Sequence, residues 1–128
     1  MEALTTHGIT VRAKAQYLPE QSNPRQGRFV FGYHISIENG SKHTVQLLSR
    51  RWVIKNAAGM VRVVEGLGVV GRQPVLAPGE AHQYASYCEL NTDLGSMVGT
   101  YLMKRLDTQE LFDVRIPQFL LVIPAKWN

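Results

Sequence analysis

The chain has 128 residues, of which 45% are hydrophobic and 19% charged, and its 14 basic and 10 acidic residues give a formal net charge of +4. This length and composition are typical of one globular domain and exclude disorder, and no apolar run approaches the roughly 20 residues of a membrane span. The basic residues are scattered singly or in pairs without a nucleic-acid-binding motif, so we expect no nucleic-acid partner and no membrane partner.

The N-terminus, M-E-A-L-T-T-H-G, has an acidic second residue and lacks the apolar core of a secretory signal peptide. We therefore expect residues 1–8 to be a flexible N-terminus and the protein to be cytoplasmic. Cys88 is the only cysteine, which excludes an internal disulfide and agrees with a reducing compartment.

Strand patterns fill the first half of the chain. Residues 9–17 alternate between apolar and polar, which predicts a strand with one buried face. A polar loop over 18–27 precedes a second strand, in which every other residue from Phe29 to Ile37 is apolar. Asn39-Gly40 then predicts a tight hairpin turn into a third strand, V-Q-L-L-S-R-R-W-V-I-K.

The second half repeats the pattern of strand and turn. A-A-G at 57–59 and A-P-G-E at 77–80 are turns, followed by M-V-R-V-V-E and A-H-Q-Y-A-S-Y-C-E-L respectively. Further strands follow, with no segment of three helical turns. About eight short strands without a βαβ repeat predict an all-β fold, a two-sheet antiparallel sandwich of the immunoglobulin or fibronectin type III kind. A closed barrel is the competing architecture.

Trp52 lies on one face of its predicted strand with Arg50 and Ile54. A tryptophan in this position is typical of the core between two sheets. We expect its indole to be buried and the Arg50 guanidinium to reach the rim of the sandwich.

The sequence predicts neither a catalytic nor a metal site, and no cofactor. Its four histidines occur on separate segments, without the spacing of metal ligands: His7, His34, His43 and His82. Cys88 lies within a strand, where a buried, unreactive thiol is more common than a nucleophile. We therefore expect the protein not to be an enzyme.

Residues 65–74 read E-G-L-G-V-V-G-R-Q-P, and Gly66, Gly68 and Gly71 fit the G-x-G-x-x-G spacing of dinucleotide-binding loops. That mechanism needs a helix after the glycines, which the prolines at 74 and 78 exclude. We call residues 66–72 the glycine loop, and two interpretations of it remain.

In the first interpretation, which we favour, the glycines permit bulges and positive φ where the strand bends. In the second, backbone N–H groups form a nest for a phosphate or carboxylate. Arginine side chains would assist the nest: Arg72, with Arg50 or Arg51.

Several motifs together resemble the ApaG family, also called CorD: L-L-S-R-R-W-V-I-K-N from Leu47, G-L-G-V-V-G-R-Q-P-V-L-A-P-G-E from Gly66, G-S-M-V-G-T-Y-L-M from Gly95 and F-D-V-R-I-P-Q-F from Phe112. The similarity runs from about Val11 to Ile123, so the resemblance implies one ApaG domain over residues 1–128. Asp93 stands where the family usually has proline.

The resemblance also implies a fibronectin type III-like sandwich. Bacterial members are associated with diadenosine tetraphosphate hydrolysis by gene neighbourhood and with cobalt and magnesium tolerance by name. Related eukaryotic domains are parts of F-box and polymerase-interacting proteins.

Taken together, the residues and the resemblance predict a non-enzymatic interaction module with a protein partner. The alternative is a small-molecule sensor that binds a phosphorylated nucleotide, pyrophosphate or a divalent metal through the Gly66–Gly71 loop.

Overall fold

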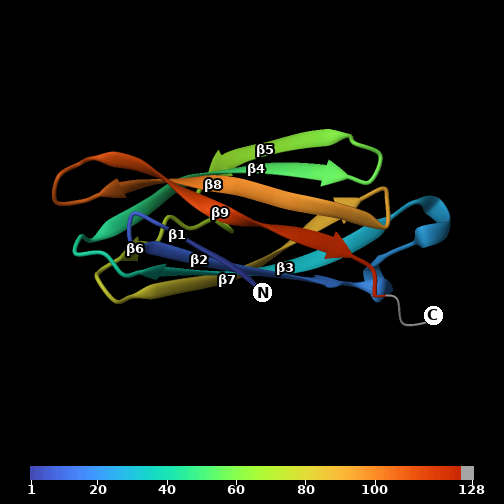
Figure 1. Ribbon diagram of the computed structural model, residues 1–128, viewed down its shortest axis with the longest axis horizontal. Coiled ribbons are helices and arrows are strands. Elements are labelled where there is room, and N and C mark those ends of the chain that lie inside the picture. Colours follow the sequence, from blue (N-terminus) through green and yellow to red (C-terminus); the bar gives the residue numbers. More distant parts are fainter. Residues whose placement is uncertain (125–128) are drawn as a thin grey trace.

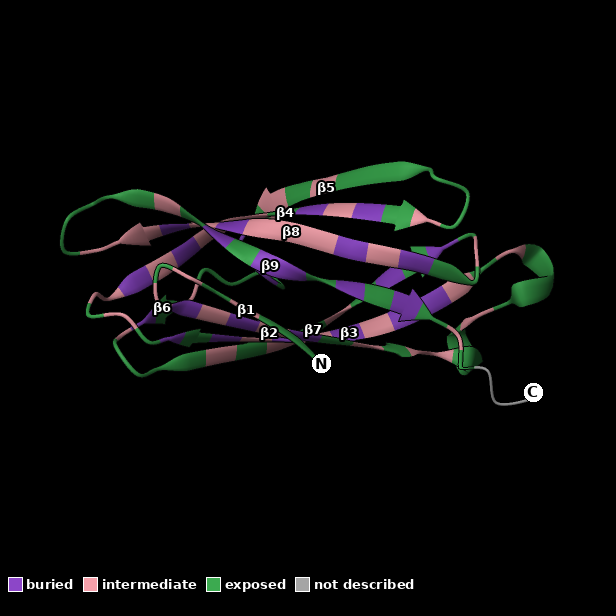
Figure 2. Ribbon diagram, viewed as in Figure 1, coloured by how far each residue is buried: buried purple, intermediate pink, exposed green. Residues whose placement is uncertain are grey.

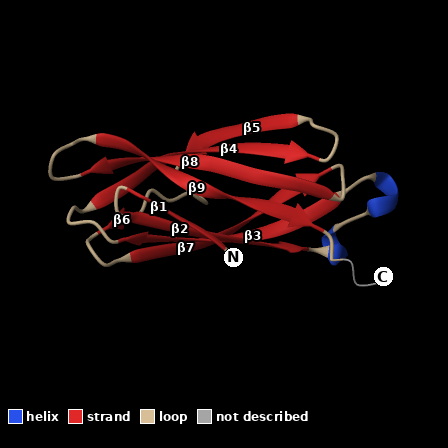
Figure 3. Ribbon diagram, viewed as in Figure 1, coloured by secondary structure: helices blue, strands red, loops and turns tan. Residues whose placement is uncertain are grey.

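The computed structural model describes residues 1–124 of the predicted domain, and strands make up most of this part (Figure 3). The elements, in chain order, are β1 (Glu2–Thr6), β2 (Ile9–Tyr17), the 3-10 turns η1 (Pro19–Gln21) and η2 (Pro24–Gln26), β3 (Phe29–Asn39), β4 (Val45–Asn56), β5 (Val61–Leu67), β6 (Val75–Leu76), β7 (Ala81–Leu90), β8 (Leu94–Arg105) and β9 (Leu111–Val122). Within residues 1–124, no helix has the length and apolar character needed to cross a membrane.

The strands form two antiparallel sheets packed face to face (Figure 1). The first sheet has the order β1-β2-β3-β7, and the second has the order β5-β4-β8-β9, with β6 also paired to β4. Alternate residues of each strand face the partner sheet, as the period-two pattern requires. The predicted all-β sandwich is therefore confirmed.

The prediction of a flexible N-terminus over residues 1–8 does not match the structure. Residues 2–6 form β1, which pairs with β2 from Glu2↔Ala13 to Thr6↔Ile9. The connecting turn has positive φ at both His7 and Gly8, as in a type I′ hairpin. The strand is only five residues long and mostly exposed, so it lacks the apolar alternation by which longer strands are recognised.

The predicted hairpin at Asn39-Gly40 is also wrong, because β3 pairs with β2 and β7, whereas β4 lies in the second sheet. Asn39 is fully buried, and its amide holds the crossover loop between the sheets. Its Nδ2 donates to the carbonyls of His43 at 2.8 Å and Leu76 at 2.9 Å, and its Oδ1 accepts from the Ser41 amide at 2.9 Å. The asparagine thus serves through its side chain instead of through a left-handed backbone.

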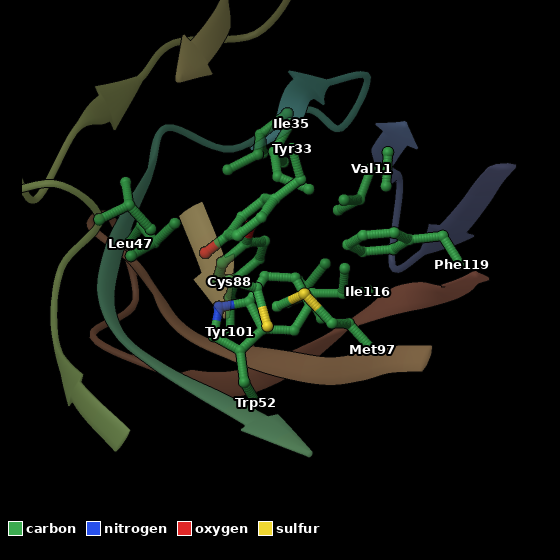
Figure 4. Close-up of a cluster of buried hydrophobic side chains, with 14 of the residues drawn as sticks. Val11, Tyr33, Ile35, Leu47, Trp52, Cys88, Met97, Tyr101, Ile116 and Phe119 are labelled. Atoms are coloured by element: carbon green, nitrogen blue, oxygen red, sulfur yellow. The ribbon is translucent and has the colours of Figure 1, made fainter. Parts of the chain in front are cut away.

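An aromatic cluster links the two sheets at the centre of the core (Figure 4). The Trp52 ring lies 5.5 Å from the Tyr33 ring of the first sheet and 5.9 Å from the Phe119 ring of β9, both edge to face. Trp52 is 2% exposed, which confirms its predicted place in the core. Its buried Nε1 has no hydrogen-bond partner among residues 1–124.

The two long sides of the sandwich differ. On what we call the closed side, β9 packs against β1 and β2, and the Arg115 amide donates to Thr6 Oγ1 at 3.2 Å. On the open side, the edge strands are β5 and β7, and no comparable packing joins them within the described residues. Side chains span this gap, chiefly that of Arg62, whose Nη2 lies 3.0 Å from the Glu89 carbonyl.

Candidate functional site

The glycine loop lies on the open side and connects β5 to β6, which both pair with β4. β5 pairs with the later part of β4, and β6 pairs with Val45 and Gln46 at its start. Between them, Val69 is 1% exposed and anchors the loop in the core. Val69 and Arg72 exchange backbone hydrogen bonds of 2.8 and 3.0 Å around a turn with positive φ at Val70 and Gly71. This is the geometry of a type I′ turn.

A local constraint of backbone conformation or packing explains why each of these three positions is a glycine. Gly68 has a φ of +62°, and a Cβ there would lie 2.2 Å from the Arg72 carbonyl oxygen. Gly71 has a φ of +75° in open space, so conformation alone requires glycine. Gly66 has no positive φ, but a Cβ would lie 2.8 Å from Arg50 Nη1. These geometries favour the backbone interpretation.

The loop's own hydrogen bonds occupy several groups that an anion nest would need. The amides of Gly68, Val69 and Arg72 donate to backbone carbonyls. Arg50 Nη1 donates to the carbonyls of Leu67 and Gly68, both at 3.0 Å. The Arg50 guanidinium therefore binds the loop itself.

The structure does not gather all three predicted arginines around one point: Arg50 and Arg51 border one hollow of about 470 Å³ with Gly66, whereas Arg72 borders another. Arg50 and Arg51 are adjacent on β4 and project to opposite faces of the sheet. Arg51 Nε lies 3.2 Å from Glu65 Oε1 on the outer face. Of the three arginines, Arg72 at the loop tip is the one without an ion pair or side-chain hydrogen bond among residues 1–124.

Arg72 borders a hollow of about 290 Å³ between the loop tip and β7. Its walls include Val69 and Val70 from the loop and His82 and Tyr84 from β7. The pKa of His82 is lowered, first by burial and then by the nearby positive charge of Arg72. The hollow thus brings together a loop residue that the sequence predicted and a histidine that it did not.

β5 itself presents a free edge. Asn56 donates its amide to the Met60 carbonyl at 3.1 Å, and Gly68 donates to Leu48 at 2.8 Å. Because bonding alternates along an antiparallel pair, the even-numbered residues of β5 turn their backbone groups toward β4. The backbone groups of four residues therefore point outward: Val61, Val63, Glu65 and Leu67.

Most of β5 is exposed (Figure 2), and its side chains are unusually apolar for an exposed strand. Val61, Val63 and Leu67 are 56%, 46% and 78% exposed on the outer face of the second sheet. Edge strands are commonly protected by lysine, proline, a bulge or other charged residues. β5 has no lysine, proline or bulge, and its two charged residues are Arg62, which reaches the Glu89 carbonyl, and Glu65, which pairs with Arg51. β9, the other edge of this sheet, contains Pro117, next to a register shift against β8.

The remaining predicted residues occupy separate places. Cys88 is 5% exposed, and burial raises the pKa of its thiol, although Arg62 Nη2 lies 3.7 Å from Sγ. Residues 1–124 contain no group of three histidine, cysteine or acidic side chains placed to hold a metal ion. His43 Nδ1 lies 2.7 Å from Asp107 Oδ2 in an exposed pair at one end of the sandwich.

Comparison with known proteins gives a consistent identification. The family model of the ApaG domain matches residues 19–105. Protein ApaG of Brucella abortus strain S19 is 48% identical over 126 residues, covering 98% of this chain and 96% of the relative. Protein ApaG of Pseudomonas paraeruginosa strain PA7 is 48% identical over 121 residues, covering 94% and 95%.

The fold is also found among solved structures. A crystal structure of a Bordetella pertussis protein named ApaA superposes with a TM-score of 0.88 at 44% identity, covering 91% of this chain and 94% of the other. Sequence and fold therefore agree over nearly the whole chain. The chain belongs to the ApaG family.

Proposed function

We propose that this chain is a non-enzymatic binding module that docks an extended segment of a partner protein along β5. The observation that carries the proposal is the free edge of β5: outward backbone groups at Val61, Val63 and Glu65, with the apolar side chains of Val61 and Val63 beside them. An added strand would satisfy these N–H and C=O groups by main-chain hydrogen bonds. It would extend the second sheet by one strand.

The outer face next to β5 supplies contacts for the partner's side chains. Val63 lies directly opposite Val53 of β4, which lies opposite Val98 of β8, so apolar residues continue across three strands. Arg51 and Glu65 form an ion pair farther along the same face. Backbone bonds would supply affinity, and this apolar row would select apolar residues at alternate positions of the partner.

The cellular setting belongs to the same proposal. We place the module in the cytoplasm, where a reduced Cys88 is expected. Any effect of the chain on cobalt and magnesium tolerance would then act through the protein partner, for which the chain would serve as an adaptor.

Affinity capture with matched variants of Val63 tests the proposal. Val63→Pro removes one outward N–H and leaves the β4 ladder intact, whereas Val63→Thr keeps that N–H and removes only apolar surface. We expect specific proteins to be retained by wild type and by Val63→Thr but lost from Val63→Pro. Equal retention of every captured protein by the proline variant would contradict docking at this edge.

A second candidate function is an anion sensor at the hollow beside Arg72. The supporting observation is that Arg72 and His82 border the same hollow, where burial and then the nearby positive charge of Arg72 lower the pKa of His82. A phosphorylated nucleotide or pyrophosphate would meet the Arg72 guanidinium there.

Thermal unfolding with pyrophosphate or diadenosine tetraphosphate separates the two functions. A sensor would show a saturable rise in Tm, lost in Arg72→Ala, against a control of equal ionic strength. The docking module predicts no such rise and no effect of Arg72→Ala on partner capture.

A further inference from the structure

The outer face of the first sheet contains a hollow of about 220 Å³ that is separate from β5 and from the glycine loop. It lies across β2, β3 and β7, where two rows of side chains cross the sheet. One row is Gln16, Gly32 and Tyr87, and the next is Lys14, His34 and Ala85.

Small residues form the floor of this hollow. Gly32 has no side chain and Ala85 has only a methyl group, so the centre of the face is lower than its surroundings. Leu18 closes one end, because its Cδ1 would lie 3.4 Å from a Cβ placed on Gly32. Tyr87, which is 68% exposed, forms an aromatic wall. A flat apolar ring fits between this wall and this floor.

The polar rim of the hollow is basic. Lys14 lies directly opposite His34 across the β2–β3 pair, and no acidic side chain lines the hollow. Farther along the same face the charges are paired, with Arg12 at 3.3 Å from Glu38 and Arg28 at 3.2 Å from Glu89. The centre of the face therefore has unpaired positive charge among residues 1–124.

We propose that this hollow binds a small aromatic carboxylate. The ring stacks against Tyr87 over Gly32 and Ala85, and the carboxylate lies toward Lys14 and His34 in the next row. Lysine supplies a point charge, and the histidine ring supplies a second N–H donor. The hollow is below the usual size of a drug-sized site, so the ligand has about nine to fifteen non-hydrogen atoms and binds with a Kd near 1 mM.

Three probes separate the chemical features of this ligand. Benzoate carries both ring and charge, benzyl alcohol carries the ring alone, and acetate carries the charge alone. In a nitrogen-proton NMR titration at constant ionic strength, we expect benzoate to shift the amides of Gly32, His34 and Tyr87 saturably. Benzyl alcohol and acetate should bind at least tenfold more weakly.

Variants chosen for the rim and floor complete the test. Lys14→Gln and Tyr87→Ala should each weaken benzoate binding about tenfold, equivalent to about 1.4 kcal/mol. Arg12→Gln, on the same strand and face but outside the hollow, is the charge control and should bind like wild type. Gly32→Ala tests whether the floor of the hollow contributes to benzoate binding. The fold should tolerate this variant, because the added methyl group meets only the flexible end of Leu18.

Unsaturable shifts with benzoate would overturn the proposal, and so would equal binding by Lys14→Gln and wild type. Benzyl alcohol binding as tightly as benzoate would also overturn it, since the basic rim would then contribute nothing. None of these variants alters β5, so partner capture serves as an independent readout that should stay unchanged.

Discussion

The closed and open sides of the sandwich differ in how far their edge strands are covered. On the closed side, β9 packs against β1 and β2, so one sheet edge protects the other. On the open side, the contacts between the two edges are local: Arg62 binds the Glu89 carbonyl of β7, and the glycine loop borders a hollow with His82 and Tyr84. The outward backbone groups of Val61, Val63 and Glu65 on β5 have no hydrogen-bond partner among residues 1–124, whereas the Leu67 carbonyl accepts from Arg50 Nη1.

This difference shows which edge of the sandwich can bind a partner without loss of stability. A buried edge contributes to folding and is unavailable to a partner, whereas an uncovered edge carries a risk of aggregation that a true partner removes. β5 lies on rigid support, because its neighbour β4 contributes Trp52 to the core. If the open side is exposed for binding while the interior is firmly packed, substitutions in the interior should lower the free energy of unfolding far more than substitutions on the free edge.

The largest effect should come from the core that both sides share. Trp52→Ala is expected to lower the free energy of unfolding by about 3 to 5 kcal/mol, because it removes contacts with Tyr33 and Phe119. Trp52→Phe should cost clearly less, since the indole N–H has no partner to lose. Denaturant unfolding measures both. A loss below about 1 kcal/mol for the alanine variant would contradict the core assignment.

The next effect distinguishes the glycines of the open side. Gly68→Ala should cost about 2 kcal/mol or more, because its Cβ meets the Arg72 carbonyl in addition to the left-handed backbone penalty. Gly71→Ala should cost about 1 kcal/mol, from conformation alone. Arg72→Ala should be nearly silent. The same unfolding assay ranks the three, and equal costs for both glycines would contradict the loop geometry.

Alkaline pH should lower the stability of the fold, because two tyrosine hydroxyls lie between the sheets. Burial raises the pKa of Tyr101 and Tyr84, whose hydroxyls lie 2.5 Å apart. Because the folded state keeps these protons longer than the unfolded state, the free energy of unfolding should be level below about pH 10 and fall above it. Tyr84→Phe should reduce the slope of that fall. An unchanged slope in this variant would remove Tyr84 as a source of the pH dependence.

Only a small effect on stability is expected for Val63→Pro at the free edge. Its N–H points away from β4, so the loss should stay below about 1 kcal/mol. Val64→Pro is the matched control, since it removes a ladder bond to β4 and should cost about 3 kcal/mol. Thermal and denaturant unfolding of both variants sharpen the comparison, and equal losses would mean that β5 is not a free edge.

The sequence predicted those features that depend on neighbouring residues. Period-two patterning locates the strands around Phe31 and Trp52, and the positive φ of Gly68 and Gly71 agrees with the backbone interpretation of the glycines. Features that depend on strand order were missed. M-V-R-V-V-E reads as a strand, but its position at an edge follows only from the pairing of β4 with β8.

The sequence also does not show which of two roles a polar side chain has. Asn39 before Gly40 indicates a hairpin by its backbone preference, whereas the structure uses its amide to hold a crossover between sheets. His82 and Arg72 are ten positions apart, and only the fold of the glycine loop over β7 brings them to one hollow. Such pairs depend on tertiary contact and leave no local signal.

Amide hydrogen exchange at Val63 and Val64 tests the central claim most directly. In the free chain, we predict rapid exchange at Val63, whose N–H points outward, and protection at Val64, whose N–H points toward β4. Adding the captured partner should protect Val63 and leave the amides of β1 unchanged. Protection of Val63 in the free chain, or continued rapid exchange with the partner bound, would contradict docking by strand addition at β5.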